Sequence, residues 1–265
     1  MKGSIIGDII GSVYINKPVD ANNFQLIKPT SAYTDDTILT LSTIDALLNN
    51  KSFSESLRDW VNKCPLAGYR EEFLDWVLSN NTHVYISKGN GAARRISPIG
   101  IAANSLEEAM AQAEETTIIT HNIPLKIKAS KAVAGAIYLA KTDGIKKEIK
   151  QFVEDVFEFT INDNTNGYSA ASVEESPVPA ALSAFLQSDS YEDAIKKAIL
   201  IGGPTNTLAS ITGGIAHAYY KHIPKSIIRK SLARLNPEMK NLLVAFEEKY
   251  FPEQKTPAEF ILNIR

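Results

Sequence analysis

The chain has 265 residues, enough for one large domain or two small ones, and its 22% charged and 44% hydrophobic residues are ordinary for a globular protein. A formal net charge of −2 argues against a nucleic-acid partner and against a membrane-surface partner. The single cysteine, Cys64, excludes a disulfide framework and a thiolate metal cluster, and it favours a reducing, cytoplasmic location.

The first segment, residues 3–14, is small and apolar, with glycines at positions 3, 7 and 11. This spacing of four places the glycines on one face of a helix, where a second helix can approach closely. Asp8 interrupts the segment, and an unpaired buried carboxylate is costly, so it must be capped by backbone N–H groups or belong to a polar site. The apolar run is too brief for a signal peptide, and no stretch reaches the roughly 18 apolar residues of a membrane span.

Prolines and asparagines predict a loop over residues 15–33, which leads into the next helix. Thr34 is a natural N-cap for that helix, and Asp35 and Asp36 fall in its first turn. The helix dipole alone favours acidic residues at this position, and the spacing by itself favours this structural role. The functional alternative is that the three side chains offer hard oxygen ligands to a divalent cation.

Two amphipathic helices are predicted at residues 54–63 and 69–79, with Trp60 and Trp76 as core residues. The segment 80–100 then contains two glycines around Asn90, followed by small residues. Such a flexible turn allows its backbone to approach a phosphate. The adjacent Arg94 and Arg95 could assist, although one of them could equally be a surface charge.

Helices are predicted next at residues 105–120, with Ser105 as cap, at 125–141 and at 145–158. His121 follows the first of these, and a lone histidine at a helix end is more often a cap or a surface group than a ligand contact. The polar stretch 160–177 is predicted to be a loop, long enough to serve as a lid or a binding loop.

A glycine-led turn at residues 202–208 separates a helix at 191–201 from a closely packed helix at 205–220. The N-terminus of the second helix presents free N–H groups and the positive end of its dipole. This geometry could hold an anion or place side-chain oxygens on a cation. The polar residues of the turn are a proline, two threonines and Asn206, and it contains no carboxylate.

The remaining predicted helices cover residues 178–188, 224–235, 237–250 and 256–263. No useful stretch alternates as a strand does, and the best candidate, residues 84–86, is short. The sequence therefore predicts an all-α protein of roughly a dozen helices, forming a single compact domain over residues 1–265.

Six stretches, taken together and in this order, resemble the ADP-ribosylglycohydrolase family, the group that includes the dinitrogenase-reductase-activating glycohydrolase. The stretches are Gly3–Tyr14, Thr34–Thr37, Gly89–Pro98, Thr120–His121, Val178–Pro179 and Gly202–Tyr220. They cover nearly the whole chain, and the specificity lies in the ordered set rather than in any one piece. The resemblance implies a compact all-α fold.

The resemblance also implies a ligand and a set of contacts. Active members of the family cleave the bond between ADP-ribose and a modified side chain, using two divalent cations. By resemblance, cation ligands are expected at Thr34, Asp35, Asp36 and Thr207. Ligand contacts are expected at Gly89, Asn90, Gly91, Ala92, Ala93, Arg95 and His121, with the glycine turn against the phosphates.

Three departures from the family pattern affect charged chemistry. Ile15 follows Tyr14 where the family has a glutamate that activates or orients water, and a lost base costs a factor of ~10²–10⁴ in rate. Pro204 and Asn206 replace the two aspartates of the late motif. Two close divalent cations need several carboxylates to offset their repulsion, so the expectation is one weakly held Mg²⁺ or Mn²⁺, or none.

Three hypotheses follow. The favoured one is a non-catalytic member that retains the cleft and binds ADP-ribose, an ADP-ribosylated protein or a protein partner. The second is an active, altered hydrolase with one metal at Asp35 and Asp36 and a further carboxylate from Asp8, Glu174 or Glu175; Asp8 or Asp36 would then be the catalytic residue. The third is a purely structural interaction protein whose cleft is closed, for example by Ile15.

Overall fold

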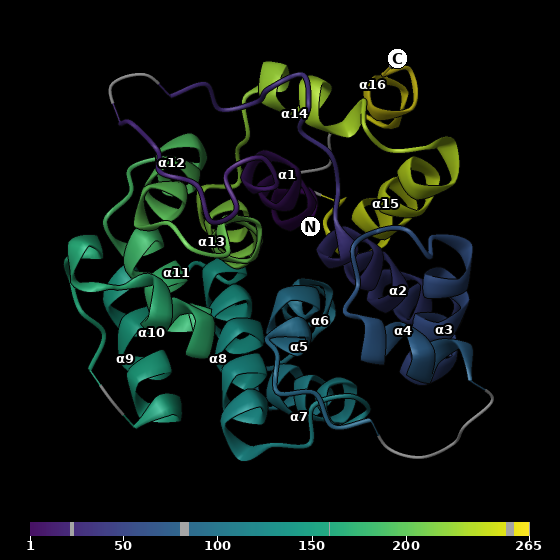
Figure 1. Cartoon of the computed structure of the whole chain (residues 1–265), viewed down its shortest axis with the longest axis horizontal. Helices are drawn as coiled ribbons and strands as arrows, with labels where there is room; N and C mark the ends of the chain where they lie inside the picture. The colour runs from purple at the N-terminus through teal and green to yellow at the C-terminus, as the bar shows by residue number, and fades with distance from the viewer. Residues whose placement is uncertain (22–23, 80–84, 159, 253–256, 265) are drawn as a thin grey trace.

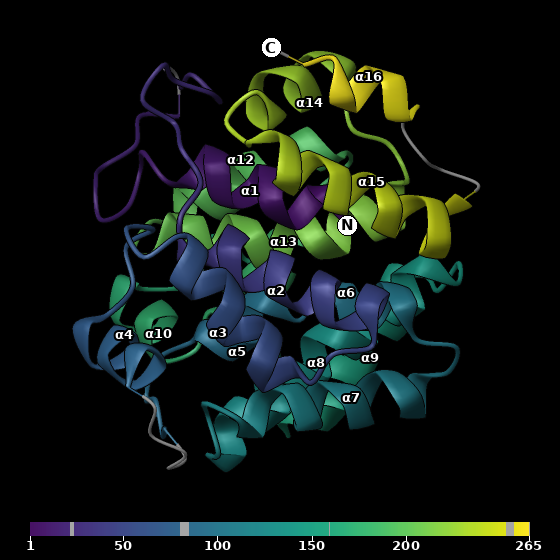
Figure 2. The ribbon, with the colours of Figure 1, turned by 90° about the vertical axis from the view of Figure 1, so that its right-hand side faces the viewer.

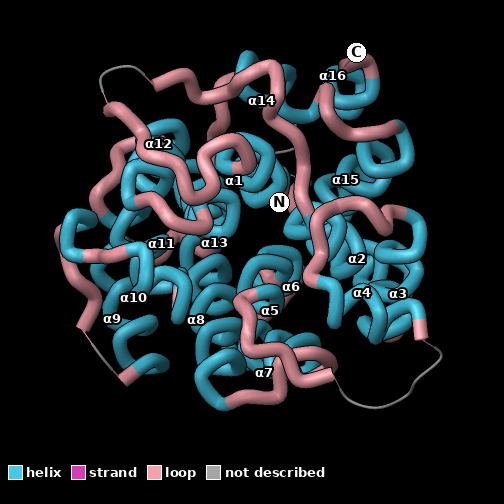
Figure 3. Tube along the Cα trace, viewed as in Figure 1, coloured by secondary structure: helices cyan, strands magenta, loops and turns pink. Residues whose placement is uncertain are grey.

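The computed structural model describes residues 1–21, 24–79, 85–158, 160–252 and 257–264. Within these ranges every regular element is helical, with sixteen α-helices and one 3₁₀ helix (Figure 3). The predicted all-α fold is therefore confirmed. No helix in the described part of the chain combines the length and the apolar character needed to cross a membrane.

The helices, in chain order, are α1 (Lys2–Gly11), α2 (Asp35–Asn49), α3 (Phe53–Lys63), α4 (Glu71–Leu78), α5 (Gly91–Arg95), α6 (Ser97–Ala102), α7 (Leu106–Ile118), α8 (Pro124–Lys141), α9 (Lys146–Phe157), η1 (Thr165–Gly167), α10 (Ala170–Glu175), α11 (Pro177–Leu186), α12 (Tyr191–Ile201), α13 (Thr205–Tyr220), α14 (Lys225–Leu232), α15 (Pro237–Tyr250) and α16 (Ala258–Leu262).

Helices α1 and α13 pack against each other in the middle of the molecule (Figures 1 and 2). The predicted glycine face of α1 makes this contact. A Cβ atom added to Gly7 would lie 2.0 Å from the carbonyl oxygen of Ala209, and one added to Gly11 would lie 2.4 Å from that of Thr205. Only glycine allows two helix backbones to come this close. The contact brings the end of α1 beside the start of α13.

The other helices surround this central pair, with α2–α4 on one side and α9–α12 on the other in Figure 1. One large hydrophobic cluster runs through most of them, and a smaller one joins α2, α3 and α4. Trp60 is buried in the large cluster, as predicted. Trp76 is only half-buried and packs against the smaller cluster.

The predicted caps Thr34 and Ser105 accept hydrogen bonds from the first turns of α2 and α7. Three short helices, α5, α6 and α10, were not predicted, because five or six residues are too few to show a helical period. The prediction of a loop over residues 160–177 is corrected, since this stretch contains η1 and α10. Of the weak strand candidate, Val84 lies outside the described residues, and Tyr85 and Ile86 belong to a loop.

Candidate functional site

A cleft of about 330 Å³ opens where the starts of α2 and α13 face the loop that precedes α5. This volume is at the lower end of the roughly 300–1,000 Å³ of small-molecule sites. One end of the cleft is polar and is formed by the start of α2 and by the turn before α13. Ser87, Gly89, Asn90, Gly91 and His121 also line the cleft, as do the aromatic side chains of Phe73 and Tyr85.

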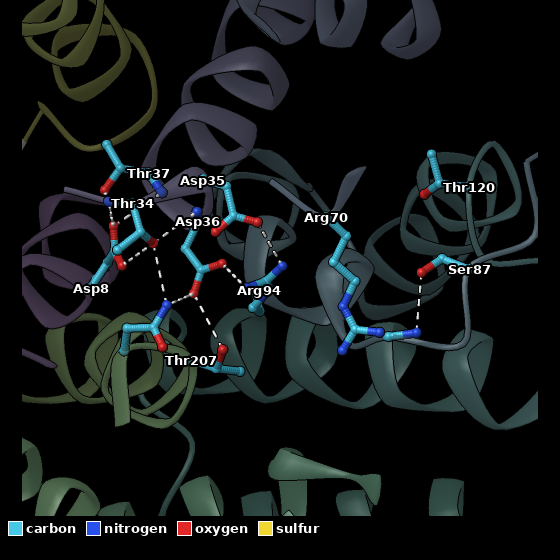
Figure 4. Close-up of polar contacts among 12 residues, drawn as sticks. Asp8, Thr34, Asp35, Asp36, Thr37, Arg70, Ser87, Arg94, Thr120 and Thr207 are labelled. Carbon is cyan, nitrogen blue, oxygen red and sulfur yellow. Dashed lines mark hydrogen bonds and ion pairs between the residues drawn. The ribbon is translucent and has the colours of Figure 1, made fainter. Parts of the chain in front are cut away.

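Asp8 lies behind the polar end and ties α1 to the start of α2 (Figure 4). Its Oδ2 accepts hydrogen bonds from the backbone N–H and the hydroxyl of Thr37, at 3.2 and 2.6 Å, and from the N–H of Thr34, at 2.9 Å. Its Oδ1 accepts from the Thr34 hydroxyl at 2.6 Å. Both roles left open for this carboxylate are thus combined, since it is capped by N–H groups and belongs to a polar cluster.

Arg94 of α5 inserts its guanidinium between the two acidic side chains of α2. Its Nη2 donates to Oδ2 of Asp35 at 3.0 Å, and its Nη1 forms an ion pair with Oδ1 of Asp36 (Figure 4). The side chain of Asp36 is fully buried, and those of Asp35 and Arg94 are 14% and 18% exposed. Neither arginine of the pair 94–95 is a surface charge, which corrects that alternative for both.

The first turn of α13 completes the polar end. Asn206 donates from Nδ2 to Oδ2 of Asp36 at 3.1 Å and to the Thr34 hydroxyl at 3.2 Å, and the Thr207 hydroxyl donates to the same Asp36 oxygen at 3.4 Å. Pro204 and Ile15 line the cleft beside them. The N–H of Asn16 donates to the carbonyl of Gly203 at 2.9 Å and so holds this segment against the turn.

The carboxyl groups of this cluster respond to burial. Burial raises the pKa of Asp8, and the hydrogen bonds from Thr34 and Thr37 oppose that rise. Burial also raises the pKa of Asp36 well above its ordinary value, and the positive charge of Arg94 opposes the increase. Burial alone would lower the pKa of Arg94, but Asp35 and Asp36 raise it above its ordinary value, so the guanidinium stays charged.

Gly89, Asn90 and Gly91, for which the resemblance predicts ligand contacts, line the cleft. A Cβ atom on Gly91 would lie 3.2 Å from the His121 ring, so this backbone position is close to the imidazole. Ala92 and Ala93 lie inside α5 and are buried, behind the residues that line the cleft.

His121 borders the cleft and is held by a buried chain of hydrogen bonds. Its Nδ1 lies 2.7 Å from the Thr120 hydroxyl, which accepts from Nη2 of Arg95 at 2.9 Å. The same Nη2 donates to the carbonyl of Thr116 at 2.8 Å, so Arg95 positions His121 through the Thr120 hydroxyl. His121 Nε2 has no hydrogen-bond partner among the described residues. Burial, followed by the nearby arginines, lowers the pKa of His121 to about 2 and keeps the ring neutral.

The mouth of the cleft is crossed by Arg70 and Glu174, whose charged groups lie 3.7 Å apart. Helix α10, which carries Glu174, is fastened to the loop by Asn90, whose Nδ2 donates to the Glu174 carbonyl at 2.9 Å. Lys126 donates to Asn90 and to the Glu175 carbonyl at 2.8 and 2.9 Å. Glu174 and Glu175 are themselves exposed.

The structure thus brings most of the residues singled out in the sequence to the lining of one cleft, although they come from widely separated segments of the chain. Sequence reasoning missed Arg94 as the partner of Asp35 and Asp36, and it missed Arg70 and Lys126 altogether. A double arginine after a glycine turn was the only signal for Arg94. Among the described residues, no group of three or more His, Cys, Asp and Glu side chains is arranged to hold a metal ion.

Two comparisons with known proteins bear on this arrangement. The family model of the ADP-ribosylglycohydrolases matches residues 1–255. A solved structure described as an ADP-ribosylglycohydrolase-related protein complex is similar in fold, with a TM-score of 0.69 at 20% sequence identity over 94% of this chain and 96% of that chain. Because the family model spans nearly the whole sequence, the chain belongs to the ADP-ribosylglycohydrolase family.

Proposed function

We propose that this protein binds ADP-ribose, free or attached to another protein, in the cleft and does not cleave the glycosidic bond. Family membership supplies the ligand class. The open cleft supports binding, because Ile15 lines the space rather than filling it. The Gly89–Gly91 backbone would face the pyrophosphate, and Nε2 of His121 would donate a hydrogen bond to the ligand.

A single observation carries the proposed loss of hydrolysis: the acidic residues are already neutralised from within the chain. Both oxygens of Asp36 and one oxygen of Asp35 contact Arg94, Asn206 or Thr207. The family implies Mg²⁺ or Mn²⁺, and this donor set does not fit a divalent cation, because the side chains facing Asp36 present hydrogens rather than lone pairs. Ile15 also offers no group that could activate water.

The alternative is an altered hydrolase that uses Asp35 and Asp36 with a further carboxylate. Both carboxylate oxygens of Asp8 already accept hydrogen bonds from Thr34 and Thr37, and Glu174 lies at the mouth of the cleft beside Arg70. These contacts favour the binding protein over the hydrolase. We also propose a cytoplasmic location, for which the one free cysteine, Cys64, is the support.

Calorimetric titration with ADP-ribose tests binding, in EDTA and in Mg²⁺. We expect saturable binding that His121→Ala weakens by about 10- to 100-fold, the effect of losing a hydrogen bond to a charged group. The exposed His222→Ala is the matched control and should bind as the wild type does. Thermal denaturation of each variant checks that it folds.

Incubation with a mono-ADP-ribosylated protein, followed by chromatography of released ADP-ribose, tests the absence of hydrolysis. Release above the uncatalysed rate that Asp35→Ala abolishes would establish the alternative hydrolase. An absence of ADP-ribose binding in both buffers would contradict the proposed ligand.

A further inference from the structure

The start of α2 places two carboxylates side by side, and one of them is fully buried. Two neighbouring carboxylates repel each other because their charges have the same sign, and burial removes the water that would screen this repulsion. Such a pair needs a positive charge close by. In this chain that charge comes from Arg94, a residue 59 positions further along the sequence from Asp35.

The guanidinium fits the space between the two acidic side chains. Its two terminal nitrogens contact different residues, Nη2 meeting Asp35 at 3.0 Å and Nη1 meeting Asp36. A planar guanidinium with several N–H donors is suited to bridge two carboxylates and remains charged at every physiological pH. One side chain thereby neutralises part of the charge that a metal ion would otherwise have to offset.

The neighbouring side chains are arranged around an arginine rather than around a metal. Asn206 presents its Nδ2 to both Asp36 and the Thr34 hydroxyl. The Thr34 hydroxyl in turn donates to Asp8 and accepts from the N–H of Asp36, so its hydrogen-bonding capacity is used. A metal ion would have to displace the guanidinium and reverse the Asn206 amide.

Arg94 is also held in place by the fold. It lies on α5 next to Arg95, a residue that is 1% exposed and whose guanidinium is bonded to Thr116 and Thr120. Arg95 therefore anchors the helix that presents Arg94. The position of the positive charge is built into the packing of α5.

We propose that Arg94 is a built-in cation that replaces a divalent metal ion between Asp35 and Asp36, so that the cleft takes its ligand without metal. Removal of Arg94 would then open a divalent-cation site between these two carboxylates. The statement about the ligand rests on the proposed function, whereas the statement about the cation does not.

Electron paramagnetic resonance of free Mn²⁺, titrated with protein, tests the cation directly. Wild type should leave Mn²⁺ unbound at concentrations where Arg94→Met binds one ion with a Kd on the order of 10⁻⁴ M, the strength of a weak site with few carboxylates. Arg70→Met is the matched control: it removes a charge from the same cleft without freeing either carboxylate, and it should bind no Mn²⁺. Arg94→Met combined with Asp36→Asn should lose the ion again.

Two results would overturn this assignment. One is stoichiometric Mn²⁺ binding by wild type that Asp35→Asn abolishes, and the other is a folded Arg94→Met variant that binds no Mn²⁺. If Arg94→Met does not fold, the wild-type titration decides, supported by Arg94→Lys, which keeps the positive charge and should also exclude Mn²⁺.

Calorimetry separates the two proposals. If the cation is built in, the ADP-ribose Kd of wild type should agree within about twofold between EDTA and Mg²⁺, because an ion without differential affinity for the two states shifts nothing. ADP-ribose binding that requires Mg²⁺ would contradict the proposal that Arg94 replaces the metal ion, but it would agree with ADP-ribose as the ligand. An absence of ADP-ribose binding in both buffers would contradict the proposed ligand. The role of Arg94 would then be tested by the Mn²⁺ titration alone.

Discussion

Asp8 and Asp36 are both completely buried carboxylates, but they are stabilised by different partners. Asp8 is surrounded by N–H and O–H donors from Thr34 and Thr37, which need no charge. Asp36 contacts the guanidinium of Arg94 as well as neutral donors. The first arrangement fixes the start of α2 against α1, and the second determines what the cleft can hold.

A neutral, buried His121 makes stability depend on pH. Its pKa falls to about 2 in the folded protein, whereas an unfolded histidine titrates near 6.5. The unfolded state therefore binds more protons below pH 6.5, so this contribution to stability is complete above pH 6.5 and is lost as the pH falls toward 2. From pH 6.5 to 4.5 the loss is about 2 kcal/mol.

Urea denaturation at a series of pH values checks this expectation. The difference in unfolding free energy between wild type and His121→Gln should change by that amount, in favour of the variant, as the solution is acidified. The exposed His222→Gln serves as the matched control variant. A difference for His121→Gln that stays constant with pH would contradict a neutral buried ring.

At the scale of elements, the contact between α1 and α13 positions the cleft. It sets the turn before α13 against the segment that follows α1, and so it brings Pro204 and Ile15 to the same cleft wall. The glycine spacing in the sequence predicts a close helix contact, and the structure shows which helix is the partner. Short helices such as α5 and α10 escape prediction because tertiary contacts, rather than their own periodicity, stabilise them.

Gly7→Ala should destabilise the protein by about 3 kcal/mol or more, the upper range for overpacking, because its Cβ would lie 2.0 Å from the backbone of Ala209. Gly89→Ala is a suitable comparison, since its nearest neighbour is the Ser87 hydroxyl at 3.3 Å, and it should cost less than about 1 kcal/mol. Chemical denaturation measures both. Equal losses of unfolding free energy in the two variants would show that the contact between α1 and α13 does not cause the destabilisation.

At the scale of the whole molecule, a buried ion pair connects the two ends of the chain. Nζ of Lys2 in α1 lies 2.8 and 2.9 Å from the two carboxylate oxygens of Glu247 in α15, which is 245 positions away. The two side chains are 2% and 1% exposed. Because neither charge reaches water, each depends on the other.

Lys2→Met should destabilise the fold by about 3–5 kcal/mol, because it leaves Glu247 buried without its partner. Adding Glu247→Leu should recover much of the loss, since a buried pair replaced by apolar side chains is often neutral. Lys196→Met breaks an exposed pair with Glu192 and should cost no more than about 1 kcal/mol. A double variant less stable than Lys2→Met would contradict this coupling.

Local spacing was enough to predict the helical class, the caps at Thr34 and Ser105, and the glycine face of α1. The order of the sequence motifs determined the family, and the residues at positions 15, 204 and 206 revealed the missing acidic groups. The groups that take the place of these acidic side chains could be identified only from long-range contacts. The contacts of Asp36 with Asn206 and of Asp35 with Arg94 span 170 and 59 positions. Such contacts depend on how α1, α2, α5 and α13 pack, which no local pattern encodes.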